Sequence, residues 1–381
     1  MEHFYVKDNN ARITVQMQML IEQEIKDGYV SCRKHPDFDY YILNYTNKCQ
    51  MDWRWTEATK LCRGLIVDGQ YNLIARSYYK FFTLDQIEDS QCDAMPSKVL
   101  DYTIAPKKDG FLGILYFSPD GKEAFVSTRG SFESEMAIEA TKMLRNKYAS
   151  LVDELDRNFS YVFEIIYPND LLTIVYKDSK LVMHGVFDNR TGEEISVKEF
   201  NAEWYSREDS FEIEYPVEEG TAWKGLEDFY SKFSYDYDEG YVITFSDFSR
   251  VKVKFDEYKQ MTRAKSSLGS PGSKRFWVNL STGKIEEVLD LNPLIATSIM
   301  GASVAKYKKV FASRLETAQL WLDTYMASTP DATIRDLGMY FAKVKMKDSG
   351  VIISLFLKDG KAEEKVWKLL IKESKNVSEE E

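Results

Sequence analysis

Short runs of β-branched, aromatic and aliphatic residues recur along the first two thirds of the chain, and turn signals separate them. Two such signals are Pro119-Asp120-Gly121 and Asn189-Arg190-Thr191-Gly192. Apolar runs of this length between turn residues are typical of β-strands. The strands predicted in this way are 40–43, 64–67, 112–117, 124–128, 161–166, 181–187, 241–245 and 250–255.

Helical periodicity appears between these strands at 14–26, 134–148 and 151–157. Strand pairs with helices inserted between them favour an α+β fold around antiparallel sheets. The pattern changes after the segment 266–274, which is rich in Ser, Gly and Pro and resembles a linker. Beyond it, apolar residues recur with helical spacing at 294–326 and 331–346, and Thr329-Pro330 fits an N-cap followed by the first helical residue.

The pattern therefore predicts three segments. Residues 1–255 form a mixed α and β domain, 256–275 form a linker, and 276–381 form a helical C-terminal domain. A chain of 381 residues with 44% hydrophobic content suits two or three globular domains. No apolar stretch approaches the roughly 20 residues that a membrane span needs, and the start lacks the apolar core of a signal peptide. We expect a soluble protein of the cytoplasm that does not bind membranes.

Charge and cysteine content narrow the functional classes. The four cysteines have neither a disulfide framework nor paired zinc-ligand spacing. A net charge of −11 argues against a protein that coats nucleic acid, but 246–275 carry eight Lys or Arg against three acids. We therefore expect any phosphate binding to be local.

The candidate chemistry centres on Lys107-Lys108-Asp109-Gly110. Such a tetrapeptide also occurs by chance, often as a surface turn. Here it follows an apolar run and precedes the strand 112–117, so it lies where a loop meets a sheet. A lysine amine that attacks phosphorus must be neutral, whereas the ordinary lysine pKa is about 10.4. We expect burial and the nearby cations Lys252 and Lys254 to lower the pKa of Lys107.

Several charged residues follow the lysine motif in a fixed order. Arg129 comes first, and Glu164 then lies inside an apolar strand, where a carboxylate is costly unless it is paired. Glu239 opens a further strand, and Lys252 and Lys254 lie two apart on the next one. Residues two apart on a strand share a face, so both ammonium groups can grip one phosphate while Val251, Val253 and Phe255 face the core.

This order resembles the covalent nucleotidyltransferase superfamily, and in particular the phage-type RNA ligase family 1. The resemblance covers roughly residues 40–255 and includes an upstream block, Cys62-Arg63-Gly64-Leu65-Ile66 followed by Lys80-Phe81-Phe82-Thr83-Leu84. It implies a nucleotidyltransferase (ATP-grasp-like ligase) fold built on antiparallel sheets. It also implies an ATP-dependent RNA ligase that joins 5′-phosphate and 3′-hydroxyl ends through a lysine–AMP intermediate, with ATP and Mg²⁺, or alternatively Mn²⁺, as cofactors.

The resemblance also assigns roles to residues. Lys107 would be the nucleophile, Glu239 would approach it and the metal, and Lys252 and Lys254 would bind the α-phosphate. Contacts to the rest of the nucleotide are assigned to Tyr45, Arg63, Lys80, Asp109, Gly110, Arg129, Glu164 and Val242, among which Arg63 and Lys80 face the β- and γ-phosphates and Glu164 the ribose. Arg129 replaces a residue that is usually lysine in the family, and Phe111 replaces a usual serine.

The adenine slot is expected between Val242 and the strand 181–187. His184 and Val186 are two apart there, so strand alternation would place both on its inner face. A core or edge histidine is the alternative interpretation of His184.

Two other functions stay open. A DNA ligase or RNA capping enzyme shares the same motifs, but those proteins typically continue into an all-β OB domain, whereas helices follow here. A non-catalytic nucleotide- or RNA-binding protein is the second alternative. The partners implied are RNA ends, tRNA among them, and the sequence does not indicate an oligomeric state.

Overall fold

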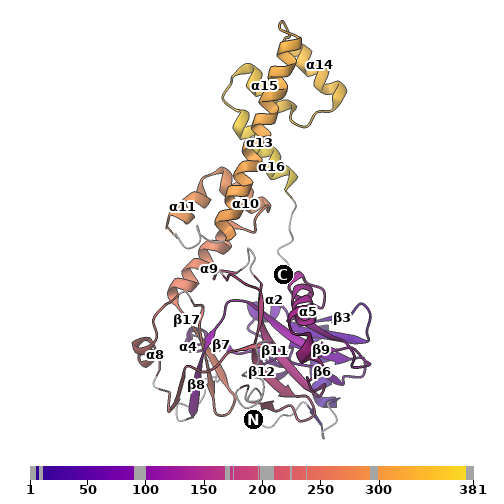
Figure 1. The fold of residues 1–381 in the computed structure, drawn as a ribbon, viewed down its shortest axis with the longest axis vertical. Coiled ribbons are helices and arrows are strands. Elements are labelled where there is room, and N and C mark those ends of the chain that lie inside the picture. Colours follow the sequence, from indigo (N-terminus) through magenta and orange to yellow (C-terminus); the bar gives the residue numbers. More distant parts are fainter. Residues whose placement is uncertain are drawn as a thin grey trace. The chain divides into compact units, whose positions relative to one another are not determined.

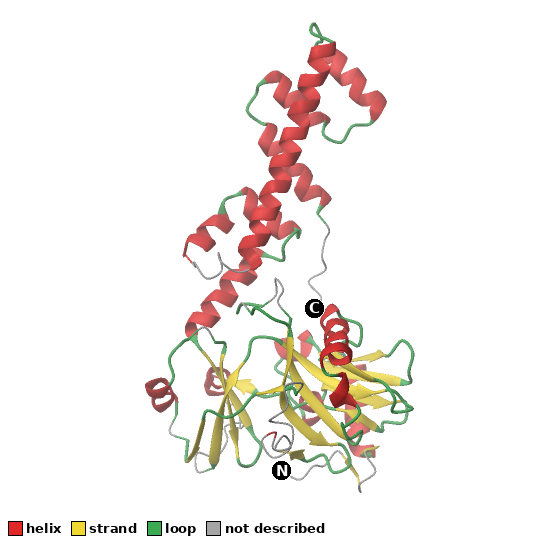
Figure 2. Cartoon of the chain, viewed as in Figure 1, coloured by secondary structure: helices red, strands yellow, loops and turns green. Residues whose placement is uncertain are grey.

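The computed structural model describes residues 6–7, 12–89, 100–167, 172–174, 176–195, 197, 210–223, 225–236, 238–291 and 299–374. The chain divides into two compact units, which are described separately. Unit 1 comprises Met1–Pro168 and Tyr176–Tyr258, and unit 2 comprises Asn169–Val175 and Lys259–Glu381. Strands and helices alternate through unit 1, whereas the described elements of unit 2 are helices (Figures 1 and 2).

The first sheet of unit 1 is antiparallel and places the upstream basic block. Its strands, in spatial order, are β3 (Val30–Lys34), β4 (Tyr40–Tyr45), β5 (Arg63–Asp68) and β6 (Leu73–Ala75). The amide of Tyr45 donates to the carbonyl of Cys62 at 2.7 Å, so the end of β4 lies beside the start of β5. Three helices accompany this sheet: α1 (Val15–Lys26), α2 (Asn47–Met51) and α3 (Glu57–Leu61).

Helix α1 forms because its apolar positions recur at helical spacing and its first turn is capped. The Thr14 hydroxyl accepts a hydrogen bond from the Met17 amide at 3.3 Å. Met17 and Ile21 are buried in one cluster with Leu43 of β4 and Leu65 of β5. This packing holds α1 on the sheet and supports the strand ends that carry Tyr45 and Arg63.

A second sheet carries Glu164. Its strands, in spatial order, are β10 (Ala124–Thr128), β9 (Phe111–Phe117), β11 (Phe159–Ile166), β12 (Lys180–Asp188) and β13 (Glu194–Ile195), with β14 (Glu212–Ile213) parallel to β12. One face is covered by α5 (Glu135–Lys147), followed by α6 (Ala149–Val152). Ala140 and Leu144 of α5 pack there against Val126, Phe163 and Ile165. Glu164 therefore lies on the opposite face of β11.

The third sheet carries the lysine motif. Its strands, in spatial order, are β15 (Glu218–Thr221), β8 (Asp101–Lys107), β16 (Gly240–Phe245), β17 (Arg250–Lys254) and β7 (Phe82–Thr83). β7 runs parallel to β17 and pairs Thr83 with Lys252, which brings the Lys80 segment to the edge of this sheet. The remaining elements of unit 1 are β1 (Val6–Lys7), β2 (Arg12–Ile13), α4 (Leu84–Asp89) and α8 (Leu226–Lys232).

Unit 2 is built from helices held together by aromatic and ionic contacts. They are α9 (Asp256–Leu268), which begins in unit 1, α10 (Lys274–Ser281), α11 (Lys284–Leu291), α13 (Ile299–Ser328), α14 (Ile334–Val344), α15 (Ser349–Leu357) and α16 (Ala362–Glu373). Trp367 of α16 stacks on Phe311 of α13 with ring centroids 4.0 Å apart and lies 6.0 Å from Trp277 of α10. Arg314 of α13 bridges Asp348 and Glu373. These contacts join three helices that are distant in sequence.

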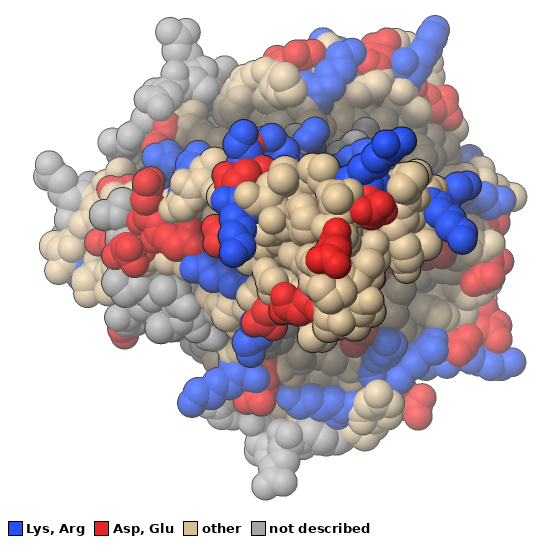
Figure 3. Space-filling view, turned by 90° about the horizontal axis from the view of Figure 1, so that it is seen from above, with Lys and Arg blue, Asp and Glu red and all other residues tan. Residues whose placement is uncertain are grey.

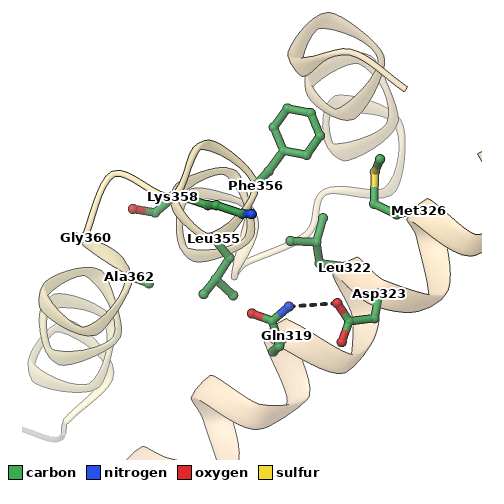
Figure 4. Close-up of a pocket in the computed structure, with 10 residues that line it drawn as sticks. Gln319, Leu322, Asp323, Met326, Leu355, Phe356, Lys358, Gly360 and Ala362 are labelled. Carbon is green, nitrogen blue, oxygen red and sulfur yellow. Dashed lines mark hydrogen bonds between the residues drawn. The ribbon is translucent and has the colours of Figure 1, made fainter. Parts of the chain in front are cut away.

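A pocket of about 560 Å³ lies within unit 2 between α13, α15 and the turn that leads into α16 (Figure 4). Its lining is mixed, with Leu322 and Phe356 beside polar groups. The Gln319 amide donates to the Asp323 carboxylate at 2.8 Å on the α13 side, and Lys358 lies on the opposite side. One cation and one acid among the lining residues give this pocket little of the positive charge that a phosphate site needs.

The eight predicted strands are present in the structure, with bounds that differ by at most two residues from those of the elements. Two predictions about helices need correction, and a third falls partly outside the described residues. The helix predicted at 151–157 is only the short α6, because a turn follows Val152. The N-cap predicted at Thr329 is instead Thr333, whose hydroxyl and backbone form a capping box with Asp336. Residues 294–298 of the predicted helix 294–326 lie outside the described residues, and α13 covers the rest.

The segment 256–275, predicted as a linker, is largely helical. α9 occupies Asp256–Leu268, and Tyr258, Met261 and Leu268 are buried. A short turn follows α9. The Asn279 side chain of α10 holds the end of α9 by donating to the carbonyls of Ser267 and Leu268 at 3.0 and 3.1 Å. The Ser, Gly and Pro content therefore marks a tight connection between two packed helices rather than an extended linker.

Charges on the face shown in Figure 3 are interspersed, with Lys and Arg side chains next to Asp and Glu. The basic residues on this face do not form a single continuous field. We therefore expect anion binding at local clusters of basic residues rather than across this whole face.

Among the described residues, none of the helices combines the length and apolarity that a bilayer crossing requires.

Candidate active site

Three neighbouring strands place the lysines of the motifs in one row. Gly240 at the start of β16 is paired with Lys107 at the end of β8 and with Lys254 at the end of β17. Val242 is paired with Lys252 in the same way. Side chains opposite one another in a sheet share a face, so Lys107, Val242, Lys252 and Lys254 lie on one side. Val251 and Val253 face the other side, where they are buried.

Glu239 is the ionic centre of this row. Its side chain is 4% exposed, and its two carboxylate oxygens contact Lys107 Nζ at 2.9 Å and Lys254 Nζ at 2.6 Å. The glycine that follows is required by the close approach of β17. A Cβ atom on Gly240 would lie 2.0 Å from the carbonyl oxygen of Val253, and its φ is +148°. The Glu-Gly pair thus lets a buried carboxylate approach two lysines across adjacent strands.

The structure corrects the expected pKa of Lys107. Burial acts to lower it, but the carboxylates of Glu239 and Glu164 outweigh burial and raise the pKa above the ordinary lysine value. The ion pair with Glu239 outweighs the effects of burial and nearby cations from which a lowered pKa was expected. Lys107 is therefore an ammonium group here, and the neutral amine needed for attack on phosphorus requires that Glu239 be drawn away from it.

The remaining cations near the row carry depressed pKa values. Burial, together with the nearby Lys80 and Lys107, holds the pKa of Lys252 well below its usual range. Burial and then Arg63 lower the pKa of Lys80 to about 8. Buried like charges disfavour one another's protonation, and a polyanion would relieve that repulsion. This cluster has the electrostatics expected of a triphosphate site.

Lys80 is also surrounded by aromatic rings. Its Nζ lies 5.5, 5.1 and 4.9 Å from the ring centroids of Tyr45, Trp55 and Phe82. Rings at this distance attract a cation and hold the side chain in one direction. Tyr45 serves a second cation as well, because Arg129 Nη1 donates to its hydroxyl at 2.6 Å. Tyr45 thus joins two basic residues that the sequence assigned to phosphate binding.

Arg63 lies at the start of β5 with an unsatisfied donor. Burial lowers the pKa of its guanidinium, and Nη1 is buried without a hydrogen-bond partner within the described part of the chain. Its guanidinium lies 5.5 Å from the ring centroid of Phe81. A buried guanidinium N–H without an acceptor is energetically costly, and an anionic ligand would remove that cost.

Glu164 and His184 face each other from neighbouring strands. Glu164 Oε2 lies 3.6 Å from His184 Nε2, and His184 is stacked on Tyr78 with ring centroids 5.6 Å apart. Burial acts to raise the pKa of Glu164, but Lys107 and His184 hold it below the usual value. Glu164 is therefore an ionised, partly buried hydrogen-bond acceptor near Lys107.

The shared face predicted for His184 and Val186 is wrong. Val162 of β11 pairs with Gly185 and Phe163 with Met183, so the register skips His184. This β-bulge reverses the alternation of side chains along β12. Val186 is consequently buried with Met183 in the cluster under α5, while His184 lies on the face of Glu164. Only His184 of the two lies on the side where the nucleotide is expected.

Asp109 and Gly110 fix the turn between the two larger sheets. The Asp109 carboxylate accepts a hydrogen bond from the Tyr258 hydroxyl at 2.9 Å, and its amide donates to the Tyr176 hydroxyl at 2.9 Å. A Cβ atom on Gly110 would lie 2.7 Å from both Glu164 Cγ and the carbonyl oxygen of Ile165. Gly110 therefore permits the lysine motif to lie directly against the strand that carries Glu164.

Several residues of the site were not anticipated from the sequence: Trp55, Tyr78, Tyr176, Glu214 and Tyr258. Tyr258 alone had a usable signal, because it follows Lys254 by four residues and lies at the start of α9. Glu214 follows the alternating run Phe211-Glu212-Ile213 and looks like an exposed strand acid. Burial instead raises its pKa to about 7. Phe111, which replaces the serine usual in the family, begins β9 and packs on the cluster under α5.

The metal assignment rests on a single carboxylate. In the described residues, no group of three or more His, Cys, Asp or Glu side chains is arranged to hold a metal ion. Mg²⁺ is often bound by only one or two carboxylates, with phosphates and water completing the shell. Glu239, buried beside the nucleophile, fits such a site if the phosphates of a nucleotide supply the other ligands.

Comparisons with known proteins found a matching family model and similar solved structures. A family model described as RNA ligase matches residues 61–259, just over half of the chain. Among solved structures, a Naegleria gruberi RNA ligase variant with ATP and Mn is 15% identical, with 47% of this chain and 54% of that chain covered and a TM-score of 0.37. The Naegleria gruberi RNA ligase with PPi is 14% identical, with 43% and 52% covered and a TM-score of 0.36.

A putative ATP-dependent DNA ligase from Aquifex aeolicus is 14% identical, with 90% of this chain and 88% of that chain covered and a TM-score of 0.44. The chain spans about half of the length of the Naegleria gruberi ligase chains. The family model includes the lysine motif, Glu164, Glu239 and both lysines of β17. Because this match covers more than half of its residues, the chain belongs to the RNA ligase family.

Proposed function

We propose that the chain is an ATP-dependent RNA ligase that joins a 5′-phosphate to a 3′-hydroxyl in three steps. Lys107 Nζ attacks the α-phosphorus of ATP, forming a phosphoramidate and releasing pyrophosphate. The AMP is then transferred to the 5′-phosphate of the RNA, which frees the lysine. The 3′-hydroxyl finally attacks that activated phosphate and releases AMP. The observation that carries the proposal is Lys107 in a partly buried cluster of cations beside Glu239.

The surrounding residues have separate roles in this scheme. Lys252 and Lys254 lie on the face of Lys107 and would bind the α-phosphate. Arg63, Lys80 and Arg129 would bind the phosphates that leave, since their guanidinium and ammonium groups converge around Tyr45 and Phe81. Glu164 would accept a hydrogen bond from the ribose, Val242 would contact adenine, and Asp109 with Gly110 would hold the loop.

Glu239 controls the protonation of the nucleophile. It stabilises the ammonium form of Lys107 through one oxygen and already contacts Lys254 through the other. Moving the carboxylate toward Lys254 would weaken the hold on the Lys107 proton. A divalent cation, Mg²⁺ or alternatively Mn²⁺, would be held by Glu239 and offset phosphate charge.

Self-labelling tests the first step. The full-length chain is incubated with ATP labelled at the α-phosphate, and covalent label on the protein is measured after denaturation. Label that is released by 5′-phosphorylated RNA with formation of a sealed product supports the proposal. A chain that takes no label under any divalent metal condition would contradict it.

A DNA ligase or capping enzyme is the alternative. Those enzymes typically place an OB domain after the Lys-x-Lys strand, whereas the described elements that follow β17 here are helices. Matched RNA and DNA ends, and labelled GTP beside labelled ATP, separate these functions.

The choice of RNA is a further proposal. The residues assigned to catalysis and nucleotide binding lie in unit 1, which we assign as the adenylyltransferase domain. We propose that the helices of unit 2 recognise the shape of a folded RNA such as tRNA, because shape readout needs a second surface. Sealing of nicked, single-stranded and stem-loop RNAs, compared with self-labelling, tests this role. Equal sealing of all three would contradict it.

A further inference from the structure

Glu214 is an acid that the scheme above does not use, and its Oε1 atom is buried. It directly follows β14, and its amide donates to the carbonyl of Met183 at 3.2 Å. Because β14 runs parallel to β12, with Ile213 opposite Met183, this places Glu214 beside His184. Its charge interacts with His184, Glu164 and Lys107. The fold thus brings a second carboxylate into the group formed by Glu164, His184 and the nucleophile.

Two polar atoms of this group are buried and unsatisfied. Oε1 of Glu214 and Nε2 of His184 have no hydrogen-bond partner within the described part of the chain. Buried polar atoms are nearly always hydrogen-bonded in folded proteins, and exceptions often mark the place of a ligand. Glu214 also lies near Glu164, a like charge that makes its position still less favourable. These features indicate a site built for hydrogen-bond donors of a ligand.

The ligand follows from the position of Lys107. An AMP attached to Lys107 presents two kinds of donor to nearby carboxylates, the ribose hydroxyls and the 6-amino group of adenine. A carboxylate at the base edge matches guanine better, because N1–H and the 2-amino group of guanine are adjacent donors. Adenine offers one donor beside an acceptor. Ribose offers two neighbouring hydroxyl donors, which suit two neighbouring carboxylates.

We propose that Glu214 accepts a hydrogen bond from a ribose hydroxyl of ATP and, with Glu164, makes the enzyme select ribonucleotides over deoxynucleotides. This inference rests on the proposed function, because it requires a nucleotide bound at Lys107. It adds a specificity-determining residue that acts on the sugar of the cofactor. His184 lies beside both acids and would limit their separation through its contact with Glu164.

The test compares nucleotides on the full-length chain. Self-adenylylation rates are measured over a range of concentrations with ATP, 2′-deoxy-ATP, 3′-deoxy-ATP and GTP. The variants are Glu214→Ala and Glu214→Gln, and the matched control is Glu212→Gln. Glu212 lies two residues earlier, is exposed, and pairs with Lys180 at 2.5 Å. Thermal unfolding of each variant shows whether it is folded.

In the wild type, removal of the contacted hydroxyl is expected to reduce kcat/KM by about 10-fold or more, because the hydrogen bond is charge-assisted. Glu214→Ala should lose that preference, mainly through KM for ATP, and Glu214→Gln should lose part of it. The control should keep it. The hydroxyl whose removal affects the wild type but not Glu214→Ala is the one contacted.

Three results would overturn the inference. Equal preferences in the wild type and Glu214→Ala would exclude a contact with ribose. A change confined to the ratio of ATP to GTP would place Glu214 at the base. An equal fall of kcat for every nucleotide would assign it a structural role. Glu214→Gln decides these points if the alanine variant does not fold. Absence of wild-type labelling would instead refute the proposed function itself.

Discussion

Each unit of the chain contains a charged side chain that forms ion pairs with two side chains of opposite charge. The two arrangements differ in their surroundings. In unit 1, Glu239 lies between Lys107 and Lys254 at 2.9 and 2.6 Å. In unit 2, Arg314 of α13 contacts Asp348 at 2.7 Å and Glu373 at 2.5 Å. The central Glu239 side chain is 4% exposed and its partners are 20% and 27% exposed, whereas Arg314 is 17% exposed and its partners are 31% and 39% exposed. The geometry is similar, but burial and neighbouring charges are not.

The difference is informative about function. The hydrogen bonds that Arg314 donates to Glu373 and to Asp348 raise the pKa of Arg314, so those charges satisfy one another. Around Glu239, burial and like charges depress the pKa values of Lys80, Lys252 and Arg63. A satisfied network stabilises a fold, whereas a surplus of buried cations prepares a site for an anion. Four predictions test this contrast, in order of decreasing effect.

Removal of the nucleophile should have the largest effect. Lys107→Ala should reduce self-labelling from ATP by about 10³-fold or more, because no other group can form the same phosphoramidate. Lys108→Ala is the matched control and should keep most labelling, since adjacent side chains point apart. Gel autoradiography of the denatured protein measures both. Labelling of Lys107→Ala together with loss in Lys108→Ala would show that the motif has been placed one residue off.

Loss of a leaving-phosphate cation should be the next largest effect. Arg63→Ala and Lys80→Ala should each slow self-adenylylation by about 10²-fold, the usual magnitude for one charge-stabilising donor. Sealing of pre-adenylylated RNA should change much less, because pyrophosphate is absent from that step. Both rates are measured on the same preparations. A matching decline in the two assays would argue that these residues act on the RNA or on the fold.

The Arg314 network should affect stability but not chemistry. Arg314→Met keeps an unbranched apolar stem and leaves two acids without their cation. Because these groups are partly exposed, we expect unit 2 to lose about 1–2 kcal/mol of unfolding free energy. Urea unfolding followed by tryptophan fluorescence measures this loss. Self-adenylylation should persist. If Arg314→Met lost self-adenylylation but unfolded at the same urea concentration as the wild type, the Arg314 network would affect chemistry rather than stability, contrary to the prediction.

Glu214 should give the smallest effect, as a pH dependence of stability. Its folded pKa of about 7 lies above the usual glutamate value of 4.5, so the folded protein binds more protons between these values. Its contribution therefore becomes less favourable as pH rises from about 4.5 to 7. Glu214→Gln cannot ionise and should be more stable than the wild type above pH 7, on the order of 1 kcal/mol, with little difference near pH 4.5. Thermal unfolding at pH 4.5, 6 and 8 measures this change, and a difference independent of pH would contradict it.

Local patterns were sufficient for much of the catalytic unit. Alternation along β17 predicts which side chains face the core, because strand geometry depends on neighbouring residues alone. The same rule fails for His184 and Val186, since a bulge on β12 is set by pairing with β11. The N-cap predicted at Thr329 fails for a related reason. Two threonines lie near the start of α14, and the capping box with Asp336 selects Thr333.

Electrostatic properties were the least predictable from the sequence. The sign of the pKa shift of Lys107 depends on Glu239, which tertiary pairing brings beside it. The burial of Glu214 likewise depends on the parallel contact between β14 and β12. The residues adjacent in sequence to Lys107 and Glu214 do not determine these distances. Residue types and their order therefore indicated the chemistry, while the protonation states required the folded structure.

The ion pair between Lys107 and Glu239 joins positions 132 residues apart along the chain. A ribosome adds about 5–20 residues per second, so on the order of 10 s separates the synthesis of the nucleophile from that of its carboxylate. Strand β16, which pairs with the strand of Lys107, and strand β17 beyond it are also made late, and pairings between such distant segments form slowly. On the proposed function, a nascent chain that already contains the lysine motif would therefore lack the assembled cation cluster until β16 and β17 have been translated.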